Sequence, residues 1–363
     1  QRKQYFTRKI EGPAPKIDGR LEAVWEQVPW ATGFVEWQPN FGEQPAEQSA
    51  FKILYDEKNL YVAYRAFDAQ PDSIVRRLSR RDFFPGDWME INIDSYHDLR
   101  TAFSFTLSAS GVRGDEFVSE NGNDWDPSWN PVWFGKTRVD SLGWTAEVQI
   151  PFSQLRFDKA PEQIWGIQVM RRNFRHQERS VWQPIAPTDN GWVSFFGELH
   201  GIRDIEPPRQ VEIQPYVVGK AESFEKIEGN PFATGSDFSL SAGLDGKVAL
   251  TSDLILDFTL NPDFGQVEAD PSVVRLDGFQ NFFSERRPFF IEGRNIFNYP
   301  LSFTAAGGNQ DADLLFYSRR IGAAPHHYPA LAPDEYAEVP ANTSILGAAK
   351  FSGKTRHGWS IGI

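Results

Sequence analysis

Apolar and polar residues alternate along much of this chain, which is the pattern of a β-strand with one buried face. In the stretch 87–94, Met89, Ile91 and Ile93 fall on one side of a strand. Glu90 falls on the other side. Many short runs of this kind, separated by polar turns, predict an all-β fold with a β-sandwich in the first half. The runs in that half are 51–68 (a hairpin), 87–94, 101–111, 143–155 and 164–174.

One stretch near the amino terminus has the period of a helix instead. Asp18 is a candidate N-cap, and the apolar residues that follow it are spaced i, i+3, i+4 and i+7. This spacing predicts a short helix that lies with its apolar face against a sheet. The apolar residues are Leu21, Val24, Trp25 and Val28.

The pair Pro207-Pro208 marks a change in the pattern. Two consecutive prolines are stiff and cannot lie centrally in a sheet, so we place a domain boundary there. The predicted domains are residues 1–205 and 206–363. Beyond the boundary the alternating runs lengthen, at 210–223, 237–250 and 253–260.

Two interpretations fit the alternation in the second half. It is either a second soluble sandwich or the start of an outer-membrane β-barrel, in which one strand face meets lipid and the other meets water. Barrels need at least ~8 strands, and we count about six here. The final run, 358–363, also stops within a strand pattern, so we expect this chain to be part of a longer polypeptide. The pattern alone leaves both interpretations open.

The segment 273–297 is rich in Phe and Arg and has no strand period. The five phenylalanines between residues 279 and 290 need burial. We therefore expect a plug or constriction inside or beneath the barrel, with Arg286 and Arg287 paired to acids such as Asp257 or Glu268. The alternative is a surface loop that docks against the first domain.

Composition narrows the partners and the chemistry. The formal charge of -12 argues against nucleic-acid binding, which needs a basic surface. The chain contains no cysteine, and hence neither disulfides nor thiolate metal sites. We find no paired carboxylates in distinct acid and base settings, no zinc-protease motif and no phosphate-binding loop. The sequence therefore favours a non-enzymatic protein.

The stretch "ENGNDWDPSWNPVW" (120–133) gathers hard oxygen ligands of the kind that calcium prefers. The spacing is not that of an EF-hand. One alternative is a loop of Asx-turns held down by its tryptophans, and another is a sugar-binding platform made by the same rings, notably Trp125 and Trp129. The candidate metal ligands are Asn121, Asn123, Asp124 and Asp126.

The first half resembles the family 9 carbohydrate-binding modules. The likeness lies in "KIDGRLEAVWEQV", "LYDEKNLYVAYRAFD", "GDWMEINID", "GWTAEVQIPFSQL" and "WVSFFGEL", in family order over about residues 14–202. The resemblance implies a β-sandwich, raises the expectation of calcium, and implies a site in which two tryptophans sandwich a sugar. The first of these places holds Phe84 here, and the second holds Trp192 with Asn190 beside it.

The same resemblance places Glu90 at the acidic position of the family site. From its strand position, we expect Glu90 to be either solvated or paired with Arg80 or Arg81. An arginine used by the family corresponds to Ser104. The second half resembles an uncharacterised barrel domain that follows such modules in envelope proteins of Bacteroidetes-type bacteria, chiefly through "NPDFGQVEADPSVVRLDGFQNFFSERRPFFIEG".

These resemblances imply an outer-membrane protein with a periplasmic amino-terminal domain that captures or takes up glycans. Its partners would be a glycan, membrane lipid and other envelope proteins. One alternative is a scaffold subunit of an outer-membrane complex with a degenerate sugar site. The other is an accessory to a glycan-cleaving enzyme.

Overall fold

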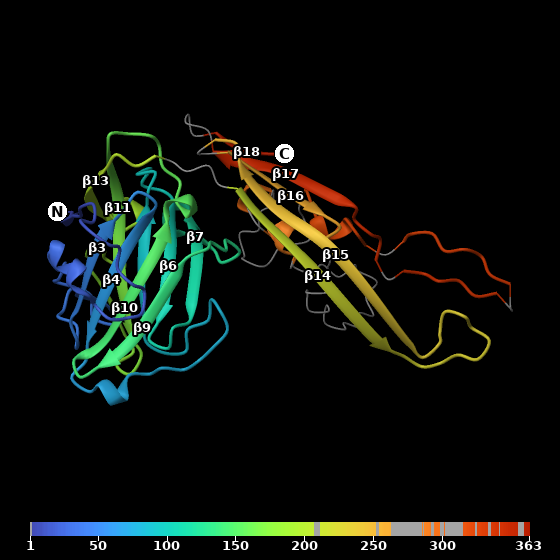
Figure 1. Ribbon diagram of the computed structural model, residues 1–363, viewed down its shortest axis with the longest axis horizontal. Coiled ribbons are helices and arrows are strands. Elements are labelled where there is room, and N and C mark those ends of the chain that lie inside the picture. Colours follow the sequence, from blue (N-terminus) through green and yellow to red (C-terminus); the bar gives the residue numbers. More distant parts are fainter. Residues whose placement is uncertain are drawn as a thin grey trace. The chain divides into compact units, whose positions relative to one another are not determined.

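The computed structural model divides into two units, residues 1–208 and 209–363 (Figure 1). Both are built from antiparallel sheets, with one parallel pairing between β1 and β13, so the all-β prediction is confirmed. The structure describes residues 2–206, 211–251, 254–262, 285, 287–291, 294–297, 301, 315–323, 325–332, 335–340, 342–354 and 359–363.

The first unit is a sandwich of a nine-stranded and a four-stranded sheet. The nine-stranded sheet runs in the order β1-β13-β11-β5-β6-β7-β8, with β12 paired to β11 and β2 paired to β12. Its strands are β1 (Gln4–Phe6), β2 (Val35–Gln38), β5 (Trp88–Asp94), β6 (Ala102–Ser108), β7 (Arg113–Ser119), β8 (Asp124–Asp126), β11 (Glu162–Asn173), β12 (Glu178–Val181) and β13 (Gly197–Arg203). The four-stranded sheet has the order β3-β4-β10-β9, from β3 (Ser49–Tyr55), β4 (Asn59–Phe67), β9 (Phe134–Asp140) and β10 (Gly143–Pro151).

The core fills the space between these two sheets. Ile91 of β5 and Phe105 of β6 meet Val62 of β4 and Val148 of β10 in one cluster of buried residues. Alternation along each strand puts these side chains on the inner face, as predicted. The polar residues of β5 and β6 consequently face away from the four-stranded sheet. Short 3-10 turns complete the unit: η1 (Ala23–Gln27), η2 (Pro71–Ser73), η3 (Glu120–Gly122), η4 (Phe152–Gln154) and η5 (Val193–Phe195).

The helix predicted to follow Asp18 is only the 3-10 turn η1. Gly19 has a φ of 83°, which a helix cannot contain. The carboxylate of Glu147 accepts the backbone N–H groups of both Asp18 and Gly19 and the indole N–H of Trp25, so it holds the segment in an irregular path. The packing prediction was correct, because Trp25 and Val28 are buried against the outer face of the four-stranded sheet.

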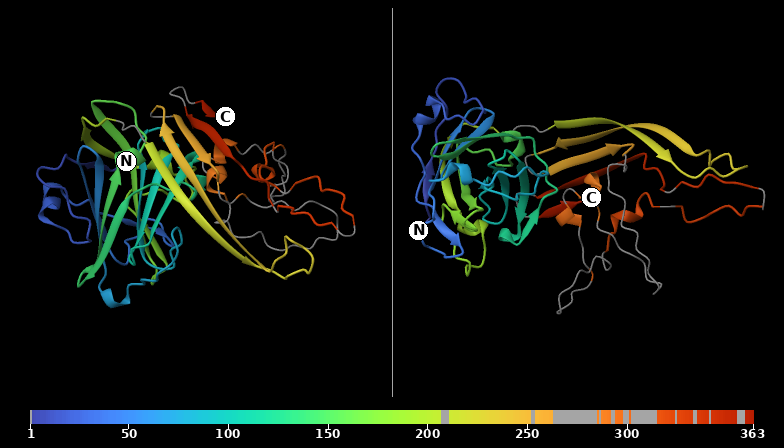
Figure 2. Two further views of the ribbon diagram at one scale, coloured as in Figure 1. Left: turned by 45° about the vertical axis from the view of Figure 1, so that its right-hand side comes forward. Right: turned by 90° about the horizontal axis from the view of Figure 1, so that it is seen from below.

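The second unit contains a five-stranded sheet in the order β14-β15-β16-β17-β18. Figure 2 shows the long, twisted β14–β15 hairpin. The strands are β14 (Val211–Ser223), β15 (Ser236–Ala249), β16 (Leu254–Leu260), β17 (Gly347–Lys354) and β18 (Ser360–Gly362). The unit also has helices α1 (Pro288–Ile291) and α2 (Arg294–Phe297) and the turn η6 (Ser318–Arg320). None of the helices that the structure describes is long and apolar enough to cross a membrane.

In this sheet the apolar face is exposed and the polar face is buried, which is the reverse of the usual arrangement. On the apolar face, Val217, Phe238 and Leu240 are 69%, 72% and 69% exposed. On the other face, Asp257 and Lys350 are 5% and 8% exposed. Soluble sheets normally bury their apolar face.

Most of the Phe- and Arg-rich segment, including Arg286, lies outside the described residues, as does Glu268. Arg287 is buried and pairs with Glu285, at 2.7 Å between Nη2 and Oε2, rather than with Asp257 as predicted. The ammonium of Lys350 lies 4.0 Å from the carboxylate of Asp257 instead. Glu285 is two residues from Arg287, so the local pair forms within the segment itself.

Candidate functional site

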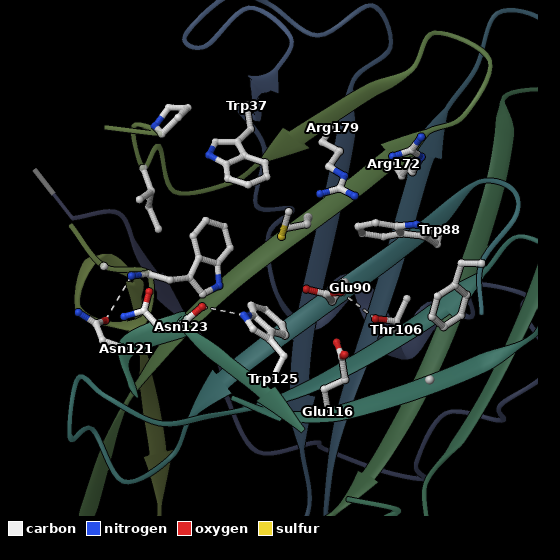
Figure 3. Close-up of a pocket in the computed structure, with 18 of the residues that line it drawn as sticks. Trp37, Trp88, Glu90, Thr106, Glu116, Asn121, Asn123, Trp125, Arg172 and Arg179 are labelled. Carbon is white, nitrogen blue, oxygen red and sulfur yellow. Dashed lines mark hydrogen bonds between the residues drawn. The ribbon is translucent and has the colours of Figure 1, made fainter. Parts of the chain in front are cut away.

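A cavity of about 810 Å³ lies on the outer face of the nine-stranded sheet, away from the four-stranded sheet. Its floor is made by residues that alternate with the core residues of β5, β6 and β11. Trp88 and Glu90 come from β5, Thr106 from β6 and Met170 from β11. Figure 3 shows the side chains of Trp88, Glu90 and Thr106 around the same space. The strand alternation that builds the core therefore also builds the cavity floor.

Aromatic rings form the walls. Trp37 of β2 and Trp192, next to η5, lie together with their ring centroids 5.5 Å apart. The indole N–H of Trp125 donates to the carbonyl oxygen of Gly122 (2.8 Å), which fixes that ring on the rim. The Nε1 atoms of Trp37 and Trp192 are buried and have no hydrogen-bond partner in the described chain.

Glu90 is buried and held by two hydrogen bonds. Asn92 donates to its Oε1 (2.7 Å) and the Thr106 hydroxyl donates to its Oε2 (2.9 Å). Burial raises the pKa of Glu90, against the lowering effect of these two bonds. The prediction that Glu90 is solvated or pairs with Arg80 or Arg81 was wrong. Arg81 pairs with Asp115, and the loops around the cavity cover the face on which Glu90 lies.

Glu116 of β7 is a second carboxyl in the cavity. Burial raises its pKa to about 7, and the negative charges of Glu90, Asp82, Asp115 and Asp126 add to the effect. This group therefore changes charge near neutral pH. Two arginines, Arg172 of β11 and Arg179 of β12, complete the polar lining.

The structure brings together most of the residues predicted to bind a ligand. One exception is Trp129, whose ring packs 5.0 Å from Phe103 and 5.4 Å from Phe105 and belongs with the core. Its ring is partly buried and does not line the cavity, so its role as a sugar platform stays a prediction. The predicted residues that line the cavity are Phe84, Glu90, Trp125, Asn190 and Trp192.

The loop predicted to bind calcium uses its side chains to hold its own shape. Asn121 Oδ1 accepts the N–H groups of Trp192 and Ser194, at 3.2 and 2.8 Å. Asp124 accepts the hydroxyl of Ser119 (2.8 Å). The other two candidate ligands also have local partners: Asn123 donates to the carbonyl of Glu120, and Asp126 accepts from Ser128.

One oxygen each of Asn121, Asp124 and Asp126 therefore already accepts a hydrogen bond, whereas the contact of Asn123 uses its amide nitrogen. Within the described residues, no group of three or more His, Cys, Asp or Glu side chains is arranged to hold a metal ion. The calcium site stays a prediction. Asn121 and Asn123 nevertheless lie at the cavity, since both contribute to its lining.

Sequence reasoning missed several lining residues. The signal for Trp88 was available, because it alternates with the core residues of β5 in the same way as Glu90. No local signal marks Trp37, which meets Trp192 across more than 150 residues of sequence. The missed residues that matter most are Trp37, Trp88, Glu116, Arg172 and Arg179.

Comparison with known families gives two matches. The family described as "Carbohydrate family 9 binding domain-like" matches residues 17–200, just over half of the 363 residues. A family described as "Domain of unknown function (DUF5916)" matches residues 207–363. Comparison with curated proteins gives no match.

Three solved structures are similar to the first unit. A family 9 carbohydrate-binding module from Caldicellulosiruptor kristjanssonii in complex with glucose is 18% identical, with 57% of this chain and 100% of that chain covered and a TM-score of 0.41. The complex with cellotriose from the same organism is 18% identical, with 56% and 96% covered and a TM-score of 0.39. A candidate carbohydrate-binding protein from Bacteroides uniformis is 15% identical, with 56% and 100% covered and a TM-score of 0.44.

Proposed function

Because this chain belongs to the carbohydrate family 9 binding domain-like family, we propose that the cavity of its first unit binds a glycan. The observation that carries the proposal is the meeting of indole rings and a fixed carboxylate in one cavity. Pyranose rings present apolar C–H faces that stack on aromatic rings, and their hydroxyls need hydrogen-bond partners. Trp125 and Trp192 offer the rings, and Glu90 offers the acceptor.

The polar groups suit hydroxyl recognition. Both oxygens of Glu90 are held in place by Asn92 and Thr106, so a sugar hydroxyl would meet an acceptor that does not need to reorganise. A volume of about 810 Å³ falls within the range of small-molecule sites, and it has room for a short saccharide.

We propose binding without catalysis. Glycoside hydrolysis needs one carboxyl that donates a proton and a second that acts as base or nucleophile. Glu90 is engaged on both oxygens, which supports a fixed acceptor rather than a proton donor. A glycan-cleaving role would be revived by turnover that disappears in Glu90→Gln but survives in Glu57→Gln, an exposed glutamate remote in sequence.

The alternative from a different class is a scaffold whose sugar site has degenerated. Phe84 and Ser104 stand where the resembled family has a sugar-binding tryptophan and arginine. Against that alternative, Trp88 and Trp37 add aromatic surface to the cavity, and Arg179 lies beside it. The cavity thus keeps the chemistry of a sugar site with a different set of residues.

The test is a glycan array probed with the full chain, followed by titration of the best ligand. Trp125→Ala and Trp192→Ala are each expected to weaken binding by about tenfold or more, as loss of an aromatic anchor does. The control is Trp30→Ala, because Trp30 does not line the cavity. Absence of any glycan ligand, or equal affinity in all three variants, would refute the proposal.

We also propose that the second unit lies in the outer membrane as part of a β-barrel. The support is the exposure of its sheet. The apolar residues Phe238 and Leu240 are exposed on one face, and the charged residues Asp257 and Lys350 are buried on the other. A strand of a transmembrane β-barrel has this pattern, with an apolar face toward lipid and a polar face toward the lumen. The five described strands are fewer than the ~8 of the smallest barrels, so closure would need further strands.

Cell fractionation tests this location. The protein is expected in the outer-membrane fraction after lysis without detergent, and it should stay there after an alkaline wash. The first unit would be periplasmic, so external protease should cleave it only after the outer membrane is permeabilised. Recovery in the buffer fraction would contradict the membrane proposal, and cleavage in intact cells would contradict the periplasmic position.

A further inference from the structure

Two arginines stand side by side in the wall of the cavity. Arg172 of β11 and Arg179 of β12 are direct partners in the antiparallel pairing of these strands. Residues opposite each other in a sheet project from the same face, so both side chains reach the cavity that they line. Figure 3 shows them beside Trp88, with Glu116 on the other side of Glu90.

Aromatic rings hold the positions of both guanidinium groups. The guanidinium carbon of Arg179 lies 5.9 Å from the ring centroid of Trp88, and that of Arg172 lies 5.3 Å from the ring centroid of Phe174. Stacking of this kind is favourable and restricts the arginine side chain. The two cations are therefore held in place before a ligand arrives.

Neither guanidinium has an ion-pair partner within the described residues. Arg172 donates to the neutral amide oxygen of Gln177 (3.0 Å), and Nε of Arg179 is buried without a hydrogen-bond partner. Arg65 and Arg175, in the same unit, do have carboxylate partners, Asp140 at 2.6 Å and Asp68 at 3.0 Å.

Two adjacent like charges are unfavourable unless an anion joins them. Burial, followed by the positive charge of Arg179, lowers the pKa of Arg172. Glu90 feels the charge of Arg179 through space, yet it forms no ion pair with it, and its own oxygens are engaged by Asn92 and Thr106. Carboxyls such as Glu116 and Asp189 also line the cavity, but no described side chain forms an ion pair with either of the two arginines.

We propose that the glycan bound here carries a carboxylate, as uronic acids do, and that Arg172 and Arg179 bind this group. The inference rests on the proposed glycan-binding function and adds the class of sugar. A carboxylate suits the planar guanidinium fork, which can donate two parallel N–H bonds to its two oxygens. The hydroxyl groups of the same saccharide would lie toward Glu90 and Thr106. The contact between the carboxylate and the two arginines would therefore also fix the orientation of the saccharide.

The experiment compares matched saccharides on the full chain. Each pair consists of a neutral hexose trisaccharide and the uronate trisaccharide of the same linkage, in both anomeric series, and a sulfated hexose trisaccharide is a third arm. Binding is followed by calorimetry for the wild type, Arg172→Gln and Arg179→Gln. The control is Arg138→Gln, since Arg138 is exposed on β9 of the other sheet.

We expect the uronate to bind about tenfold or more tightly than its neutral counterpart, with a preference that weakens as salt is added. Arg172→Gln and Arg179→Gln should each reduce that preference by about tenfold, and Arg138→Gln should leave it unchanged. Arg138→Gln should leave affinity for the neutral saccharide unchanged, and the two cavity variants should lose less affinity for the neutral saccharide than for the uronate. Tryptophan emission like that of the wild type shows that a variant is folded, and Arg179→Lys, which keeps the charge but not the fork, should retain part of the preference.

Each contrary result has its own meaning. Equal affinity for the neutral and uronate saccharides, or a preference that survives both glutamine substitutions, would overturn the carboxylate assignment while leaving glycan binding intact. Tight binding of the sulfated saccharide alone would also overturn it, in favour of a sulfate. Failure of every saccharide to bind would refute the proposed function itself.

Discussion

Glu116→Gln is expected to make the first unit more stable in alkaline solution than the wild type. The carboxyl of Glu116 lies in the cavity, where burial and the charges of Glu90, Asp82, Asp115 and Asp126 raise its pKa to about 7. Above that pH the folded protein must keep a charge in an unfavourable place. Glutamine has almost the same shape and removes the charge.

The size of the effect follows from the pKa. A carboxyl whose pKa rises from 4.5 to about 7 on folding loses ~3.4 kcal/mol of stability between these pH values, at ~1.36 kcal/mol for each tenfold change in proton affinity. Glu116 is partly accessible to solvent, which screens its charge, so we reduce the expectation to about 1–2 kcal/mol. The folded state binds the extra proton, so this contribution is present below pH ~4.5 and is lost as pH rises through ~7.

Urea unfolding followed by tryptophan fluorescence measures this difference in the first unit, because eleven of the twelve tryptophans precede residue 208. The free energies of unfolding of wild type and Glu116→Gln should be equal within error near pH 4, and the variant should be about 1–2 kcal/mol more stable at pH 8. Asp94, whose pKa is raised to about 7 by burial, is present in both proteins and cancels in the difference. If the stability difference between variant and wild type is the same at both pH values, the raised pKa of Glu116 is refuted.

Three further predictions concern other parts of the chain. Glu147→Ala leaves three N–H donors, two of them buried, without their acceptor, so it should lower the free energy of unfolding by about 2–4 kcal/mol in the same urea assay, and unchanged stability would contradict this. Because hydrogen bonds already engage one oxygen each of Asn121, Asp124 and Asp126, calcium should leave the melting temperature unchanged, whereas a rise that is lost in Asp124→Ala would restore the calcium site. Leu240→Lys on the exposed apolar face should cost about 2–4 kcal/mol in lipid bilayers if that residue lies near the membrane centre, and a variant as stable as the wild type in bilayers would speak against lipid contact there.

Alternation of residue types made much of the first unit predictable. The strand β5 has Met89, Ile91 and Ile93 in the core, as the period of two requires. The same period placed Glu90 on the outer face, but it could not show that this face is covered. Coverage depends on Trp37 and Trp192, which come from distant parts of the chain and meet only in the folded sandwich.

The failure at the amino terminus has a local cause. Leu21, Val24 and Trp25 have helical spacing, and these apolar residues do pack against the sheet. The backbone conformation is set by other residues, however. Gly19 adopts a positive φ, and the carboxylate of Glu147 accepts backbone N–H groups at the start of the segment, so the segment does not continue as a helix. Tertiary hydrogen bonds therefore override the helical period, which is common in short segments.

The arrangement of charged side chains in the cavity also could not be predicted from the sequence. Glu116 and Arg179 lie on different strands, and the pattern of each strand predicts an ordinary surface residue at that position. Only the pairing of β11 with β12 makes Arg172 and Arg179 neighbours, and only the order β5-β6-β7 brings Glu116 toward Glu90. Sheet topology, rather than local periodicity, creates the site.

The most direct test of glycan binding in the cavity is a crystal structure of the protein soaked with the tightest saccharide found on the array. We predict a sugar ring against the indole of Trp192 and a sugar hydroxyl within hydrogen-bond distance of Glu90. A saccharide bound elsewhere on the sandwich, with the cavity holding only water, would contradict the account.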